Sequence, residues 1–61
     1  MRAGDLVRIR DQGPRTRYSL KYSVDRIGMI IKEEPQRRFN RFYVLVDGNI
    51  IMVWELDLEK V

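Results

Sequence analysis

Apolar and polar residues alternate along several short segments of this chain, which is the period-two pattern of β-strands. The opening segment, Leu6 to Arg10, places Val7 and Ile9 on one face and charged residues on the other. Four later segments carry the same alternation or a short apolar run bounded by turn residues. The sequence therefore predicts strands over residues 6–10, 27–33, 41–46 (or from Phe39), 49–54 and 58–61.

Turn residues separate these segments. Asp47-Gly48 lies between two apolar runs and is the strongest hairpin signal in the chain, because both residue types tolerate positive φ. Asp11-Gln12-Gly13-Pro14 ends the first strand, and a polar turn with Pro35 follows the second. Residues 55–57 are too few for an α-helix and predict a single 3₁₀ turn. The last strand is then expected to pair with the first, which protects a sheet edge.

Residues 11–26 have no lasting helical period. Tyr18, Leu20 and Tyr22 alternate with polar residues, which predicts a long loop with some strand character. Loops of this length in compact domains are usually functional or disordered. Residues 1–61 are therefore predicted to form one all-β domain, a five-stranded small barrel with a long first loop at about residues 11–26.

The second and fourth predicted strands carry apolar side chains on both faces. One face must fill the barrel, and the other is more apolar than a free surface requires. We expect a protein interface there, formed by Ile30, Ile50, Met52 and Trp54 with Tyr18 and Tyr22 of the long loop. Two alternatives remain open: the long loop folds over this face, or Trp54 closes the open end of the barrel instead of anchoring a partner.

Size and composition narrow the range of functions. The chain has 61 residues, no cysteine and no histidine, so neither a disulfide nor a typical zinc site supplements its small core. The absence of cysteine fits a reducing cytoplasm. The first residues contain no apolar signal-peptide region, and no apolar run approaches the ~20 residues that cross a bilayer. We therefore expect no membrane partner.

Charge is distributed unevenly. Residues 1–41 carry eleven of the twelve basic residues and a net charge of +6, whereas residues 42–61 have a net charge of −3. Basic residues also alternate with aromatic ones, which is typical of single-strand nucleic-acid binders. Packing aromatics and a solvated charged face are the alternative interpretation. The candidate basic rim or nucleic-acid contact comprises Arg15, Arg17, Lys21, Arg37, Arg38 and Arg41.

The sequence predicts no catalytic, metal or cofactor site. Its serines and threonine have no histidine to act as a base, and the four glycines are too scattered for a phosphate-binding loop. Glu33 and Glu34 precede Arg37 and Arg38, which favours a surface ion pair over acid–base chemistry. A barrel this small is also expected to lack a pocket of about 300 Å³ or more. We therefore expect a protein that is not an enzyme.

Several short motifs resemble a known fold family. They are Gly4-Asp5-x-Val7-x-Ile9, Gly28-x-Ile30-Ile31, Val44-x-Val46-Asp47-Gly48, Trp54 and Leu58-Glu59-x-Val61. Their order resembles the SH3-like small barrels, with an opening similar to KOW and Tudor-type modules. It is most similar to short uncharacterised SH3-like proteins encoded by tailed phages, notably marine ones. The resemblance omits residues 11–26, and Leu45 and Ile50 stand beside the Asp-Gly hairpin where this family often carries tryptophan.

The resemblance implies an SH3-like five-stranded barrel and a non-enzymatic protein-binding module. It further implies a minor phage virion or accessory protein of the decoration, neck or tail, located in the virion or the host cytoplasm. A KOW-like module that binds nucleic acid or a transcription or translation complex is one alternative. A small host-takeover inhibitor is another. The expected partners are other protein subunits of the virion or host, a second copy of the chain, or nucleic acid.

Overall fold

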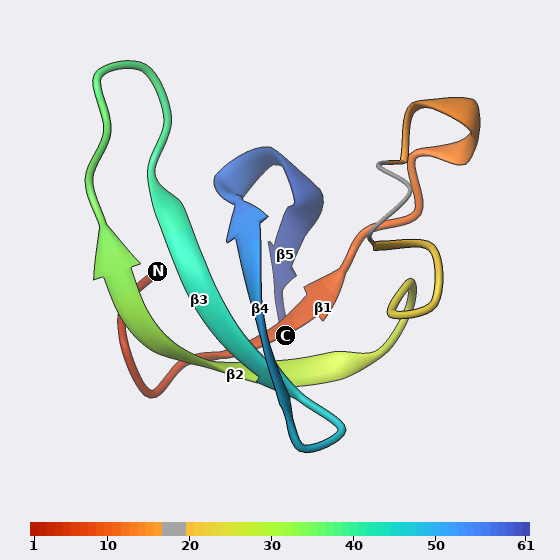
Figure 1. The fold of residues 1–61 in the computed structure, drawn as a ribbon, viewed down its shortest axis with the longest axis horizontal. Helices are drawn as coiled ribbons and strands as arrows, with labels where there is room; N and C mark the ends of the chain where they lie inside the picture. The colour runs from red at the N-terminus through yellow and green to blue at the C-terminus, as the bar shows by residue number, and fades with distance from the viewer. Residues whose placement is uncertain (17–19) are drawn as a thin grey trace.

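Five antiparallel strands form one strongly curved sheet in the computed structural model, which describes residues 1–16 and 20–61 (Figure 1). The order across the sheet is β4-β3-β2-β1-β5, so the last strand pairs with the first as the sequence predicts. The fold is all-β and of the small SH3-like barrel type. The strands are β1 (Leu6–Ile9), β2 (Ile27–Glu34), β3 (Arg41–Val46), β4 (Asn49–Trp54) and β5 (Leu58–Lys60).

The two predicted turns after β3 and β4 are confirmed. Asp47 and Gly48 join β3 to β4 with φ values of 51° and 80°, which is the positive-φ pair of a type I′ hairpin turn. A 3₁₀ turn, η3 (Glu55–Asp57), connects β4 to β5. The backbone N–H of Glu55 donates to the Asn40 carbonyl (3.1 Å). This bond fixes the start of η3 beside the β2–β3 loop.

Alternating side chains of the strands meet inside the barrel. Every core residue is at most 3% exposed, and half-buried Ile51 packs against this cluster. Burial of aliphatic and aromatic surface is the main source of stability in a domain with no disulfide. The core consists of Val7, Ile9, Leu20, Ile30, Phe42, Val44, Val46, Val53 and Leu58.

Gly28 allows β2 and β3 to approach closely. A Cβ at this position would lie 2.6 Å from Val46 Cγ2 and 2.7 Å from Val44 Cγ1. The sequence predicts either a bulge or a close backbone approach at Gly28, and the approach is confirmed. The irregularity lies further along the strand, where the β2–β3 register shifts between Ile30 and Lys32. This shift turns two consecutive residues, Ile31 and Lys32, toward solvent.

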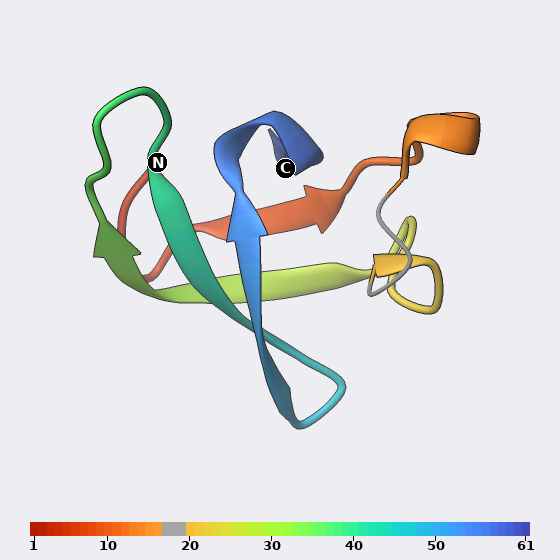
Figure 2. The same cartoon turned by 45° about the horizontal axis from the view of Figure 1, so that its top comes forward.

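The chain between β1 and β2 is a long loop, as predicted. It includes a 3₁₀ turn, η1 (Gly13–Arg15), and Leu20, which is 1% exposed and joins the core. Strand character is absent from its described residues, 11–16 and 20–26. Figures 1 and 2 show this loop and the β2–β3 loop on opposite sides of η3. The two loops therefore flank the segment that closes the barrel.

The prediction that Ile30 lies on the outer apolar face is wrong. Ile30 is fully buried, whereas its neighbours Met29 and Ile31 are each 39% exposed. Apolar residues occupy both faces of β2, so the alternation alone does not determine which face points inward. In β4, by contrast, Val53 is buried and Ile50 is 60% exposed, as the sequence predicts.

Candidate functional site

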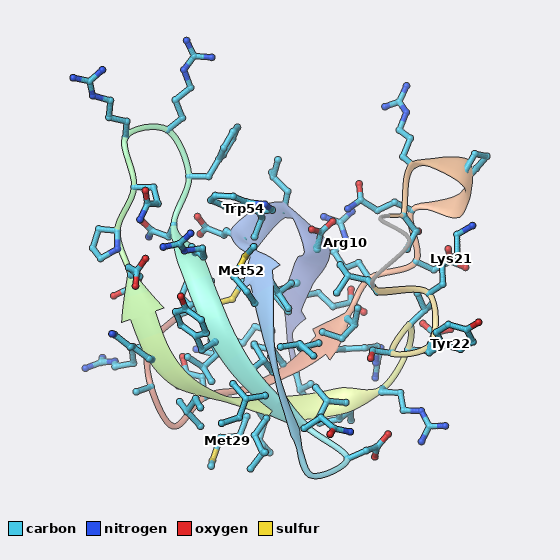
Figure 3. All side chains as sticks on the ribbon, in the orientation of Figure 1. Arg10, Lys21, Tyr22, Met29, Met52 and Trp54 are labelled. Carbon is cyan, nitrogen blue, oxygen red and sulfur yellow. The ribbon has the colours of Figure 1, made fainter. Side chains whose placement is uncertain are left out.

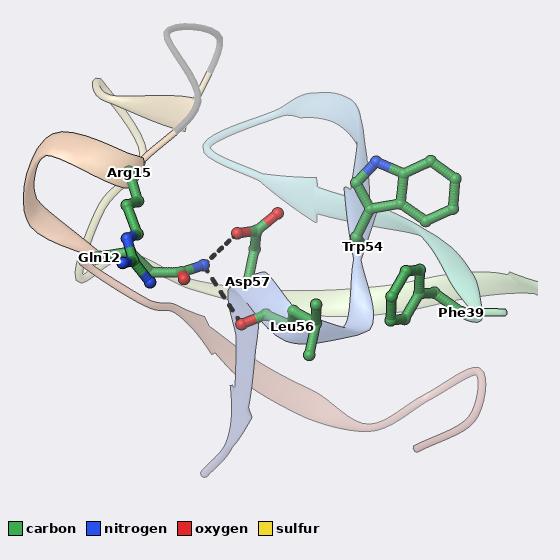
Figure 4. Close-up of a pocket in the computed structure, with 6 residues that line it drawn as sticks. All are labelled: Gln12, Arg15, Phe39, Trp54, Leu56 and Asp57. Carbon is green, nitrogen blue, oxygen red and sulfur yellow. Dashed lines mark hydrogen bonds between the residues drawn. The ribbon is translucent and has the colours of Figure 1, made fainter.

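A groove crosses the end of the barrel between the two loops that flank η3. Its volume is about 380 Å³, which corrects the expectation that so small a barrel leaves no hollow of about 300 Å³. Phe39 comes from the β2–β3 loop, Trp54 from the end of β4, and Leu56 from η3. Figure 4 shows the two aromatic rings at one end of the groove and the polar residues Gln12 and Arg15 at the other.

Hydrogen bonds hold the long loop against η3. The Gln12 side-chain amide donates to an Asp57 carboxylate oxygen and to the Leu56 carbonyl, the latter at 3.3 Å (Figure 4). The Arg10 guanidinium donates to the same carbonyl at 3.2 Å, and the Arg10 backbone N–H donates to the Asp57 carbonyl at 2.8 Å. Thr16 Oγ1 accepts the Gln12 backbone N–H at 2.8 Å. The polar end of the groove is therefore built by contacts across the barrel closure.

The aromatic end of the groove is supported by a charged residue of β3. Arg41 lies directly opposite Trp54 in the β3–β4 ladder. Its guanidinium forms an ion pair with Glu34 and lies 6.0 Å from the ring centroids of both Tyr43 and Trp54, at the limit of a cation–π contact. Because Arg41 is half-buried and ion-paired, it positions Trp54 and does not belong to a free basic rim.

Three other arginines, one in the lining of the groove and two in the loop that supplies Phe39, have no ion pair among the described residues. Arg15 lines its polar end, and Arg37 and Arg38 lie in the β2–β3 loop next to Phe39. All three are exposed. The carboxylates of Glu33 and Glu34 bond instead with Asn40, Lys32 and Arg41. The predicted ion pair of Glu33 and Glu34 with Arg37 and Arg38 is therefore replaced, and these two arginines remain available to an acidic ligand.

The structure brings together only part of the predicted interface. Ile50, Met52 and Trp54 share the outer face of β4, with Met52 and Trp54 half-buried. Tyr22 is 82% exposed and lies on the long loop, well apart from Met52 and Trp54 in Figure 3. Tyr18 and Arg17 lie outside the described residues. Ile30 belongs to the core, as stated above.

Lys21 also lies away from the groove. It lines a second, shallower hollow of about 230 Å³ on the long loop, together with Asp11 and Thr16. Its lining mixes polar and apolar groups, and no aromatic ring among the described residues contributes to it. Of the six predicted basic residues, Arg15, Arg37 and Arg38 therefore remain candidates for ligand contact at the groove.

Four residues that line the groove were not predicted as part of a binding surface: Gln12, Phe39, Leu56 and Asp57. Phe39 stood out only as an aromatic beside arginines. Gln12 carried no signal, because its role depends on the closure that places η1 beside η3. The predicted 3₁₀ turn was the one indication of this surface in the sequence. In the structure the turn leaves Leu56 55% exposed, whereas Asp57 is 7% exposed.

The described part of the chain contains no group of three or more acidic, histidine or cysteine residues able to hold a metal ion. Within the same residues, no helix has the length and apolar character needed to span a membrane. The groove therefore offers two aromatic rings, one aliphatic side chain, one carboxylate and nearby guanidinium groups. These groups are suited to apolar and charged contacts with a ligand.

Comparison of the chain with protein-family models, curated proteins and solved structures found no match.

Proposed function

We propose that this protein is a non-catalytic protein-binding module that holds a short segment of its partner in the groove. The observation that carries the proposal is the placement of Phe39, Trp54 and Leu56 around one open hollow of about 380 Å³. Exposed aromatics beside a concave surface are typical anchors of protein interfaces. The groove accommodates one or two bulky apolar side chains of an extended segment.

Charge around the groove defines the chemistry of the segment. Arg15, Arg37 and Arg38 favour acidic residues on either side of the apolar anchor, because guanidinium groups bind carboxylates in a bidentate manner. Inside the groove, the side-chain oxygen of Gln12 can accept a hydrogen bond from the backbone of the segment. The preferred ligand is therefore an apolar residue flanked by aspartate or glutamate.

Selection of displayed random peptides on the immobilised protein tests this proposal. We expect enriched peptides to contain a bulky apolar residue with acidic neighbours. Their binding should change the fluorescence of Trp54, which is the only tryptophan in the chain. Truncation of an anchoring aromatic at an interface costs about 1–2 kcal/mol or more, so Phe39→Ala should weaken binding about tenfold.

Leu45→Ala is the matched control for Phe39→Ala. Leu45 is 37% exposed and Phe39 is 45% exposed, but Leu45 lies on the outer face of β3 and does not line the groove. The control should bind the selected peptides as the unmodified protein does. Equal binding by Phe39→Ala and the unmodified protein would contradict the proposal.

Single-stranded nucleic acid is a second candidate ligand, supported by Arg37 and Arg38 directly before an exposed phenylalanine. Such a ligand would stack a base on Phe39 while its phosphates contact the arginines. Aliphatic Leu56 lines the groove beside the two rings, which suits a bulky apolar side chain more than a stacked base, and for this reason we prefer the peptide. The affinity for a fluorescent oligothymidine, measured over a series of salt concentrations, tests this candidate. Nucleic-acid binding should be detectable at low salt and should fall steeply as the salt concentration rises.

The setting we propose for this module is a phage particle, where another virion subunit supplies the bound segment. This part of the proposal is supported by the sequence resemblance alone. Mass spectrometry of purified particles should detect the chain in a fixed ratio to the major subunits. If the chain is found in the infected cell and not in the particle, the virion setting is wrong, and a pull-down from host lysate then tests the host-takeover alternative.

A further inference from the structure

A row of exposed apolar side chains crosses the outer face of the sheet. Strand register places Leu6 opposite Met29, Met29 opposite Leu45, and Leu45 opposite Ile50. Their exposed fractions are 54%, 39%, 37% and 60% in that order. Ile27 and Ile31 extend the row along β2. We call these six residues the outer patch.

The outer patch and the groove lie at different ends of β4, because Ile50 near its start belongs to the patch and Trp54, its last residue, lines the groove. Figure 3 shows Met29 on the underside of the sheet, away from Trp54 at the upper end. A contiguous apolar surface on a small domain usually marks an interaction site. Occupation of the outer patch therefore leaves the groove open to its own ligand.

The charged rim of the outer patch carries equal numbers of both signs. Three ion pairs lie beside the apolar row: Arg8–Glu59 at 3.2 Å, Arg26–Asp47 at 3.0 Å, and Lys32 with half-buried Glu34 at 3.9 Å. Register places Arg8 opposite Ile27, and Lys32 follows Ile31 in the chain. The six charges of these pairs sum to zero, although the whole chain has a net charge of +3.

A neutral rim with both signs suits a copy of the same surface. In a two-fold interface the same patch faces itself, so a rim of one sign would repel its copy, whereas Arg8 of one copy can pair with Glu59 of the other. Nucleic acid and anionic membranes select surfaces with an excess of lysine and arginine, which this rim lacks. We infer that the outer patch is a two-fold interface between two copies of this chain.

A standard dimer interface would cover only part of the surface of this chain. A standard interface buries about 800 Å² on each partner, which is less than a fifth of the 4491 Å² surface of this chain. The apolar row alone extends from β1 to β4, across four neighbouring strands. Apolar surface at the centre and charged side chains at the rim are the usual arrangement of a protein interface.

Sedimentation velocity over a concentration series tests the inference. The unmodified chain should shift from 7.4 kDa toward twice that mass as its concentration rises. Ile50→Lys at one end of the row and Leu6→Lys at the other introduce a charge into the apolar centre. Each should raise the dimer dissociation constant about tenfold or more.

Leu56→Lys is the matched control, because Leu56 is 55% exposed and lines the groove instead of the outer patch. It should dimerise as the unmodified chain does, and circular dichroism should show the same strand content for all variants. A monomer up to the solubility limit overturns the inference, whether or not another protein binds the patch. Equal weakening by Leu56→Lys and Ile50→Lys also overturns it.

Discussion

Gly28 lies so close to the Leu45 carbonyl that a Cβ at position 28 would be 2.7 Å from that oxygen. No rotamer change relieves this contact, because the oxygen belongs to the backbone of β3. We therefore expect Gly28→Ala to lower the free energy of unfolding by about 1–3 kcal/mol, the usual cost of overpacking a core. Urea denaturation followed by fluorescence measures this change.

Val46→Ala separates the side-chain part of this clash from the backbone part. Val46 Cγ2 would lie 2.6 Å from the new Cβ, so removing it creates space for the methyl group. The double variant Gly28→Ala with Val46→Ala should be more stable than the sum of the two single effects predicts. Strict additivity would show that the Leu45 carbonyl and Val44 Cγ1 carry the cost.

Two isoleucines with opposite environments test the assignment of faces in β2 and β4. Ile30 is fully buried and Ile50 is 60% exposed. Ile30→Ala should lower the free energy of unfolding by about 2–5 kcal/mol through the cavity it leaves. Ile50→Ala should change it by about 0.5 kcal/mol or less in dilute solution. Similar losses from both variants would contradict the burial that the structure assigns to them.

The hairpin turn between β3 and β4 makes a separate prediction. Gly48 has a φ of 80°, and nothing lies within 4 Å of a Cβ built there, so a side chain at this position causes backbone strain without a clash. Gly48→Ala should lower stability by about 1–2 kcal/mol. Gly48→Asn should cost less, because asparagine tolerates this region. Thermal denaturation of both variants compares them directly.

We expect removal of the Gln12 side chain to loosen the long loop locally. Its amide joins the loop to the Leu56 carbonyl and the Asp57 carboxylate, and Gln12→Ala removes both bonds. Amide hydrogen exchange in residues 10–16 should accelerate, while global stability falls by about 0.5–1.5 kcal/mol. Gln12→Glu places a second carboxylate beside Asp57 and should accelerate exchange further. Unchanged exchange in both variants would show that the loop is held by other contacts.

Local pattern determined much of the fold. In β3, Phe42, Val44 and Val46 alternate with more exposed residues, and the positive-φ turn after them sets the register of β4. For this reason the hairpin, the 3₁₀ turn and the closing strand are all predictable from sequence. The inward face of β2 was harder to predict, because isoleucine and methionine occupy both faces of the strand. Either choice of inward face buries apolar side chains.

The groove could not be derived from the sequence in the same way. Its residues come from positions 12–15, 39 and 54–57. The β3–β4 hairpin brings Phe39 near Trp54, but the segment of Gln12 and Arg15 meets them only where β5 pairs with β1. Leu20 illustrates the same limit: its alternation with Tyr18 and Tyr22 predicted some strand character in the long loop, whereas in the structure it fills the core. Contacts that depend on closure of the barrel leave no periodic signal along the chain.

The assembly of the groove from three distant segments links partner binding to folding. A partner that spans them recognises the folded chain only, so its binding free energy adds to that of folding. At about 100 times its dissociation constant, a partner contributes about 2.7 kcal/mol, and for a domain of this size that corresponds to a rise in melting temperature of about 10 °C or more. Thermal-shift screening of candidate peptides and proteins can therefore single out the partner by the higher melting temperature it produces.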